Sequence, residues 1–592
     1  MIRSALLFAF AAAAPLASVH AASAPANVLS TVAERSGFQR TGHYDEVIAL
    51  CAQFQKAYPK AVRCFEYGRT PEGRPMLAMA VSRTGALTAE QAKKRGLPVM
   101  LVQDGIHAGE IDGKDAGFLA LREALDNKVA QGALDKQVVL FVPVFNVDGH
   151  ERFGKWNRPN QRGPEEMGWR TTAQNINLNR DYVKADAPEM QSMLALVNAW
   201  DPLAYVDLHV TDGAKFQIDV SIQVEPVHGG DAELIQSGRA LQQGVIGDLR
   251  KQGSDPTPFY NSFDKDDDPS SGIVDSMAPP RFSTGYFPLR NRLAMLVETH
   301  SWKDYPTRVR ITHNAIVSLM EQVAVHGKEW MKTAQEADAR AVAMGGKEFP
   351  VSYRTTFNSR QIQFAGYEYT REHSDISGGL MTRYDESKPQ TWTIPLRDEV
   401  VPDVVVNAPK GGYLVPAAHA AWVSAKLKLH GISFKVLNTE QAFAEVETFR
   451  AATTKFGAAS FEGHQSLAVT GEWKHERRAL GKGALFVPIA QPKARLVMTM
   501  LEPRDADGLL GWGFFNNAFE RKEYMEAYVA EEVARDQLAA DPALREEYRR
   551  KVDSDPAFAN SPEARLEFFA RRHSSWDERF NLYPVMRTAQ AY

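Results

Sequence analysis

The chain has 592 residues, and its 69 Lys and Arg against 73 Asp and Glu give a formal net charge of −4. Hydrophobic residues make up 44% and charged residues 24%, which is the composition of a globular protein and excludes a disordered or fibrous chain. The near-neutral balance also argues against non-specific nucleic-acid binding, which requires a basic face. At about 150 residues per domain, the length predicts two to four domains.

The first 21 residues predict a secretory signal peptide. Arg3 precedes an apolar run over residues 5–16, and Val19 and Ala21 place small side chains before a cleavage site after residue 21. The alternative is a retained membrane anchor, but the apolar run is shorter than the roughly 20 residues that span a bilayer. We therefore expect an exported protein, periplasmic or secreted, without a stable membrane anchor.

Cys51 and Cys64 are the two cysteines of the sequence. A close, even pair in an oxidising compartment is a candidate disulfide, although a chain of this size does not need one for stability. Without a histidine between them, the two cysteines do not predict a zinc knuckle.

Strand and helix patterns alternate through the first half of the chain. Short apolar runs predict strands, and amphipathic stretches predict helices. In chain order we expect a helix at 43–58, strands at 76–81 and 99–103, a helix at 113–126, a strand at 137–144, a helix at 190–199, a strand at 203–208, a helix at 232–251, a strand at 293–297 and a long helix at 308–340. This order predicts an α/β fold with a mixed, mostly parallel central sheet flanked by helices.

The pattern changes after Gly345-Gly346, which we take as a domain boundary. We expect antiparallel sheet over 348–400, strands at 413–416, 432–437 and 485–488, helices at 417–430 and from 489 to about 501, and charged helices over 517–572. The domain prediction is therefore a signal peptide at 1–21, a first domain at 22–342, and a second, accessory domain at 343–592 of α/β or α+β type.

The segment at 103–110 carries the first chemical signal. His107 and Glu110 are three residues apart, in a loop that contains glycine and lies between a predicted strand and a predicted helix. Neutral imidazole and carboxylate suit Zn²⁺, and two His with one Glu plus an open fourth position is a known catalytic set. An H-x-x-E pair alone is weak evidence, because such pairs also occur by chance.

Two later strand ends add to this signal. His209 follows the predicted strand at 203–208, and open α/β sheets bind ligands at the carboxyl ends of their strands. Glu298 follows the predicted strand at 293–297, where a carboxylate could take the proton of a water activated by zinc. Taken singly, an ordinary strand-end histidine and a surface acid are the alternatives.

Together, these motifs resemble the carboxypeptidase A/B-type zinc metallocarboxypeptidases. The ordered series is H-x-x-E at 107–110, W-R-x-T at 169–172, N-R at 179–180, His209 and Glu298, with further similarity at 66–75 and 144–149. The resemblance covers about residues 40–330. It implies one zinc ion per catalytic domain and hydrolysis of the C-terminal peptide bond of a peptide or protein substrate with a free C-terminus.

The resemblance also implies a role for each matching residue. His107, Glu110 and His209 would bind zinc, and Glu298 would act as general base and then as general acid. Arg170 would stabilise the oxyanion, with Arg158 and Arg162 as competitors. Asn179 and Arg180 would bind the substrate carboxylate, unless Arg180 instead forms a salt bridge to Asp181.

Two positions depart from the family pattern. The family usually has an aspartate that orients a zinc-binding histidine where this chain has Asn177, whose amide oxygen can still accept an imidazole N–H. The tyrosine that closes over the substrate is hard to place. Tyr286 is our candidate, although it could equally be core packing, and Tyr260 and Tyr305 remain alternatives.

The same zinc site would also serve other hydrolases. A periplasmic hydrolase of D- or γ-linked cell-wall peptides and an amidase or deacylase acting on acyl-amino acids are the alternative functions. A non-catalytic binding module would lack a ligand or the base, and both are present. The second half shows no clustered catalytic motif, so His419, His430, His464 and His475 are expected to be surface or core residues. The oligomeric state is left open.

Overall fold

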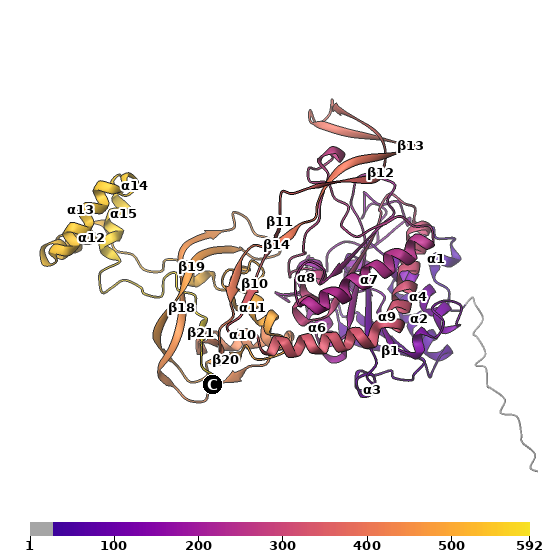
Figure 1. Cartoon of the computed structure of the whole chain (residues 1–592), viewed down its shortest axis with the longest axis horizontal. Helices are drawn as coiled ribbons and strands as arrows, with labels where there is room; N and C mark the ends of the chain where they lie inside the picture. The colour runs from indigo at the N-terminus through magenta and orange to yellow at the C-terminus, as the bar shows by residue number, and fades with distance from the viewer. Residues whose placement is uncertain (1–27) are drawn as a thin grey trace, which may run out of the picture.

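The computed structural model describes residues 28–592, so the predicted signal peptide lies outside the described residues. Two parts of the chain lie side by side, and the long helix α9 (Tyr305–Val342) packs along the first part and leads toward the second (Figure 1). No helix among residues 28–592 combines the length and apolarity that crossing a bilayer would require.

The first part is built on an eight-stranded sheet in the order β1-β2-β4-β3-β5-β9-β6-β7. The central strands β4, β3, β5 and β9 run parallel to one another, whereas β1 and β2 pair antiparallel at one side of the sheet. At the other side, β6 pairs antiparallel with β9 and parallel with β7. The predicted mixed, mostly parallel sheet is confirmed. The strands are β1 (Val62–Arg69), β2 (Pro75–Val81), β3 (Val99–Asp104), β4 (Val138–Val142), β5 (Ala204–Val210), β6 (Val220–Glu225), β7 (Pro256–Thr257) and β9 (Leu293–Thr299).

Helices cover both faces of this sheet. Side chains alternate along β5, so Leu208 points toward Gly113 of α4 whereas Asp207 on the opposite face accepts a hydrogen bond from Ser283 of α8. Strands buried on both faces explain why β3, β4 and β5 are buried at every position. The helices are α1 (Val32–Arg35), α2 (Tyr44–Ala57), α3 (Ala89–Lys94), α4 (Asp112–Leu125), α5 (Val147–His150), α6 (Pro188–Trp200), α7 (Ala232–Lys251), α8 (Ser283–Tyr286) and α9.

Two local devices fix the positions of these elements. Helix α9 begins at Tyr305 because the Asp304 side chain accepts a hydrogen bond from the Thr307 amide and Pro306 stands in the first turn. The candidate disulfide is confirmed, since Cys51 of α2 is bonded to Cys64 of β1 with their Cα atoms 5.5 Å apart.

The second part contains a six-stranded antiparallel sheet in the order β17-β20-β16-β21-β18-β19, with helices α10 and α11. This confirms a C-terminal region of mixed strands and helices. Its elements are β10 (Glu348–Pro350), β11 (Tyr353–Thr355), β14 (Val400–Pro402), β15 (Val405–Asn407), β16 (Gly412–Val415), α10 (Ala417–Leu429), β17 (Lys435–Val436), β18 (Gln441–Phe456), β19 (Leu467–Leu480), β20 (Leu485–Pro488), α11 (Ala494–Leu501) and β21 (Met586–Thr588).

Two segments depart from this compact arrangement. The hairpin β12 (Arg360–His373) and β13 (Leu380–Arg397) projects over the first part, where β13 pairs with β8 (Ile273–Val274) (Figure 1). Helices α12 (Ala527–Ala540), α13 (Pro542–Ser554), α14 (Pro556–Ala559) and α15 (Pro562–Ala570) enclose a small core of their own away from both sheets (Figure 1). The boundary expected near Gly345 stays a prediction, because the β8–β13 pairing joins residues from both sides of it.

Candidate metal centre

A short loop after β3 carries His107 and Glu110. Gly105, at φ +68°, turns the chain out of the strand, and the carboxylate of Asp104 accepts hydrogen bonds from the amides of Gly113 and Lys114 at the start of α4. Asp112, the first residue of α4, is paired with the buried Arg308 of α9 at 2.9 Å. The loop is therefore held at both ends by the strand and the helix.

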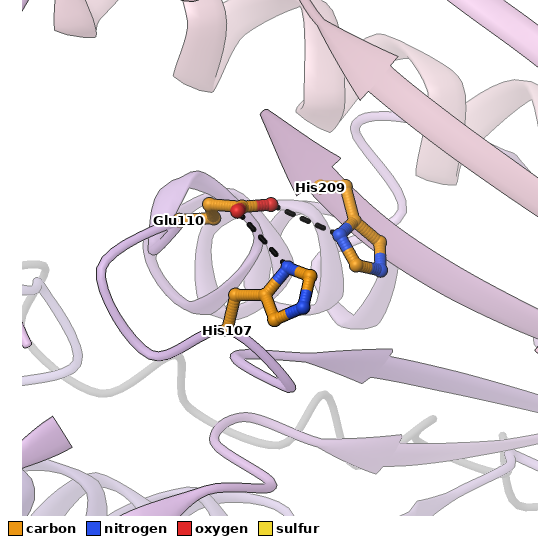
Figure 2. Close-up of side chains that lie close together, drawn as sticks. All are labelled: His107, Glu110 and His209. Carbon is orange, nitrogen blue, oxygen red and sulfur yellow. Dashed lines mark hydrogen bonds and ion pairs between the residues drawn. The ribbon is translucent and has the colours of Figure 1, made fainter. Parts of the chain in front are cut away.

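Three side chains from this loop and from β5 converge. The Nδ1 atom of His107 lies 3.0 Å from Glu110 Oε1, and the Nδ1 atom of His209 lies 2.9 Å from Glu110 Oε2 (Figure 2). All three side chains are buried. Within residues 28–592, these three residues form the one group of His, Cys, Asp and Glu side chains close enough together to hold a metal ion.

The remaining ring nitrogens of the two histidines face acceptors. Nε2 of His107 lies 3.2 Å from the Asn177 side-chain oxygen, and Nε2 of His209 lies 3.0 Å from Asp207 Oδ1. With both imidazoles neutral and the proton of each on Nε2, both Nδ1 atoms present lone pairs toward the Glu110 carboxylate. Three electron-pair donors aimed at one another repel unless a cation lies among them, so this donor set fits zinc.

The charges around the three residues follow from burial and from their neighbours. Burial lowers the pKa of His107 to about 4, which keeps this imidazole neutral. Burial opposes ionisation of Glu110, but the Arg158 guanidinium and His107 hold the pKa of this carboxyl well below its usual range. Burial likewise disfavours charge on His209, but Asp207 raises its pKa well above the usual value. His107 and Glu110 are thus already in the neutral and ionised forms that bind a metal, whereas His209 would give up a proton on binding one.

Glu298 lies on the strand next to His209. The two residues are paired in register between β9 and β5, and Glu298 is only 7% exposed. Its Oε2 atom is buried without a hydrogen-bond partner among the described residues. Burial raises the pKa of Glu298 to about 8, and Glu110 and Asp212 add to that rise. The side chain therefore presents a buried carboxyl oxygen without a hydrogen-bond partner next to His209 of the triad.

Two arginines reach Glu110 from the segment that follows α5. Arg158 approaches Glu110 Oε1 to 2.9 Å and also pairs with Asp212, whereas the Arg170 guanidinium lies 3.6 Å from Glu110 Oε1 and is one-third exposed. Gly109 makes room for Arg158, because a Cβ atom there would stand 2.7 Å from Arg158 Cγ. The third candidate, Arg162, pairs with Glu386 of the projecting hairpin.

Asn179 and Arg180 lie in a short turn that Asn177 caps, its side-chain oxygen accepting the Asn179 amide at 3.0 Å. Asp181 is paired with Lys184 and accepts two backbone amides, so the predicted alternative of an Arg180–Asp181 salt bridge is absent. The Arg180 guanidinium instead stacks over the Phe282 ring at 4.2 Å. Burial and the neighbouring Arg170 lower the pKa of Arg180, which marks a place that would be stabilised by an anion.

Tyr286 does not fit the predicted role of a mobile tyrosine. It is fully buried, its ring packs against Tyr182 and Phe287, and its hydroxyl lies 2.8 Å from His430 Nδ1 in the second part. These contacts are core packing, the alternative that the sequence left open for Tyr286. Tyr305 is also buried and bonds to Asp115. Tyr260 is the alternative that fits, since it is partly exposed. Burial, and next the nearby Glu298 carboxyl, raise the pKa of Tyr260 well above the usual value.

The Tyr286–His430 contact predicts acid sensitivity. Burial lowers the pKa of His430 to about 3 in the folded protein. As the pH falls below about 6.5, this histidine is therefore protonated in the unfolded chain before it is protonated in the folded protein. Stability is complete above pH 6.5 and falls progressively down to pH 3, by about 2 kcal/mol at pH 5. We expect urea unfolding to show that the difference in free energy of unfolding between wild type and His430→Gln decreases by that amount from pH 7.5 to pH 5. A constant difference would show that His430 is not a neutral buried group.

The role of Asp207 beside His209 was not predicted from the sequence. Its position two residues before His209 is the signal that could have indicated it. Residues two apart on a strand share a face, so an acid two positions before a strand-end histidine can orient its ring. The contact of Asn177 with His107 agrees with the orienting role considered for that position.

Comparisons with known proteins agree with the motifs. Residues 47–216 match the family model described as zinc carboxypeptidase, which confirms the resemblance for this segment. The segment contains the triad and Arg180, and Glu298 lies beyond it. Carboxypeptidase D of Drosophila melanogaster is 29% identical over 162 residues, which cover 26% of this chain and 11% of that protein. The chain thus spans about a tenth of this curated relative.

Solved structures of carboxypeptidases also match. Carboxypeptidase A of Helicoverpa armigera is 15% identical, covering 50% of this chain and 75% of that one with a TM-score of 0.36. A metallo-carboxypeptidase of Burkholderia cenocepacia is 16% identical, covering 48% and 69% with a TM-score of 0.34.

Proposed function

We propose that this protein, whose residues 47–216 match the zinc carboxypeptidase family, is a metallocarboxypeptidase that hydrolyses the C-terminal peptide bond of peptides or proteins. The observation that carries the proposal is the convergence of His107, Glu110 and His209 beside Glu298, which has a free buried carboxylate oxygen. We also propose that the protein is exported and acts outside the cytoplasm, as the N-terminal pattern predicts.

His107, Glu110 and His209 would hold the zinc ion through Nδ1, a carboxylate oxygen and Nδ1. When bound, zinc lowers the pKa of a water and polarises the substrate carbonyl. Asn177, hydrogen-bonded to Nε2 of His107, and Asp207, the ion-pair partner of His209, would hold the two imidazole rings in place.

Four other residues would act on the substrate, in proton transfer, in oxyanion stabilisation and in binding its carboxylate. Glu298 Oε2 takes a proton from the attacking water and then delivers it to the amine nitrogen that leaves. Arg170, which lies near the triad and is partly exposed, can donate hydrogen bonds to the oxygen where negative charge develops. Arg180 and Asn179 would hold the free carboxylate, so only the last peptide bond is presented to the triad.

The test of this proposal is Arg180→Ala. We expect kcat/KM for peptides with a free C-terminus to fall about 10- to 100-fold, because a charged hydrogen bond worth about 1.5–3 kcal/mol is lost. Release of single C-terminal residues is followed by mass spectrometry, with the same peptides amidated as the comparison. Wild type should leave the amidated peptides intact.

Arg310→Ala, an exposed position on α9, is the matched control. Equal cleavage of amidated and free-acid peptides by wild type would contradict the carboxylate-anchoring role and favour an amidase. Cleavage of D- or γ-linked peptides alone would favour the cell-wall hydrolase.

A further inference from the structure

The loop between β18 and β19 reaches from the second part to the candidate site. The Glu462 carboxylate accepts a hydrogen bond from the backbone amide of Asn177 at 3.1 Å, although the two residues are 285 positions apart. Next to it, His464 Nε2 lies 2.7 Å from Asp186. The loop therefore contacts the first part on either side of the Asn179–Arg180 turn.

The loop is held firmly in this position. Phe461 stacks on Trp512, and the Arg281 guanidinium lies over both rings. Glu462 itself adopts a left-handed backbone with φ +49°, a conformation that residues with a side chain rarely adopt. Surrounding contacts are required to maintain such a conformation, and it directs the Glu462 side chain toward Asn177.

Asn177 links Glu462 to two parts of the candidate site, the His107 ring and the turn that carries Arg180. Its side-chain oxygen faces Nε2 of His107 and accepts the amide of Asn179. Its backbone amide has Glu462 as its hydrogen-bond acceptor. The carboxylate of Glu462 thus fixes the residue that orients a candidate metal ligand and begins the turn carrying Arg180.

A second contact supports the same turn. Asp507 pairs with Arg281 at 2.7 Å and accepts its backbone amide. The next residue, Phe282, supplies the ring under the Arg180 guanidinium. The second part therefore braces Arg180 from both the Asn177 side and the Phe282 side.

We propose that Glu462 is a positioning residue of the candidate active site, supplied by the second part of the chain. It acts through Asn177 to hold His107 and Arg180, and this inference rests on the proposed function. The second part would then complete the active site, beyond the accessory role that the sequence suggested.

The test compares three variants of the full-length protein. Glu462→Ala removes the acceptor, Glu462→Gly removes it while suiting the positive φ, and Glu462→Gln keeps an oxygen that can accept the same hydrogen bond. Glu445→Ala is the matched control, because Glu445 lies in the same hairpin and pairs with Arg477 on the neighbouring strand. Each protein is measured for hydrogen exchange at the Asn177 amide, for zinc affinity by chelator competition, and for KM with free-acid peptides.

We expect Glu462→Ala and Glu462→Gly to speed exchange of the Asn177 amide at least about 10-fold and to weaken zinc binding about 10-fold, the lower end of what loss of an outer-shell partner costs. KM should rise, and Glu462→Gln and the control should behave as wild type. Unchanged exchange and zinc affinity in the first two variants would overturn the proposal. An equal defect in Glu462→Gln would also overturn it, because charge rather than the hydrogen bond would then matter. If wild type cleaves no peptide, the carboxypeptidase proposal fails, while exchange and zinc affinity still decide the role of Glu462.

Discussion

Replacing Glu298 with glutamine should lower kcat/KM for free-acid peptides by about 10³-fold or more while leaving bound zinc unchanged. Glutamine keeps the size and the burial of the side chain but cannot accept the proton that Oε2 is placed to take. Zinc should stay, because Glu298 is not one of the three converging donors. Steady-state kinetics and metal analysis on the same preparation measure both quantities.

Glu329→Gln, an exposed glutamate on α9, is the control for this substitution. A loss of less than about 10-fold in Glu298→Gln would be too small for a general base, whose contribution is typically 10²- to 10⁴-fold. Tyr260 and Asp212, two titratable groups near Glu298 that are outside the triad, would then be the next residues to replace.

Replacing His209 with alanine should weaken zinc binding by more than about 100-fold, since loss of an outer-shell partner alone costs about 10- to 100-fold. The effect is also visible as stability. Zinc at 100 times the wild-type Kd stabilises the folded protein by about 2.7 kcal/mol, and a 100-fold weaker site reduces this gain to about 0.4 kcal/mol. Thermal unfolding with and without zinc measures the difference.

His475→Ala is the matched histidine control, because that side chain is 89% exposed and lies in the second part. It should keep the full zinc-dependent stabilisation. If His209→Ala also kept it, the ion would be held elsewhere and the assignment of the triad to zinc would have to be abandoned.

Much of the first part could be predicted from the sequence because its signals are local. The strands containing Val99 and Leu208 are continuous apolar runs, which is how strands covered on both faces read. Parallel strands bring their carboxyl ends to one edge, so His209 and Glu298 could be placed near the loop after the first of these strands. Strand β6, which pairs antiparallel with β9, was not predicted.

The remaining features depend on contacts that no local pattern encodes. Tyr286 and Tyr260 are indistinguishable as residue types, and only packing shows that one bonds His430 while the other is partly exposed near Glu298. Arg158 lies closer to Glu110 than Arg170 does, because Gly109 leaves space for the Arg158 side chain. The Glu462–Asn177 hydrogen bond spans the two halves of the chain, and β18 and β19, which present that loop, were not predicted.

The pairing of β8 with β13 has a consequence for how the protein is made. Strand β8 must wait for a partner that lies about 120 residues further along the chain. At a synthesis rate of about 5–20 residues per second, this delay is roughly 6–25 seconds, during which β8 has no strand of its sheet to pair with. The three-stranded sheet that contains β8 can therefore form only after translation has passed residue 397, well beyond the residues of the candidate site.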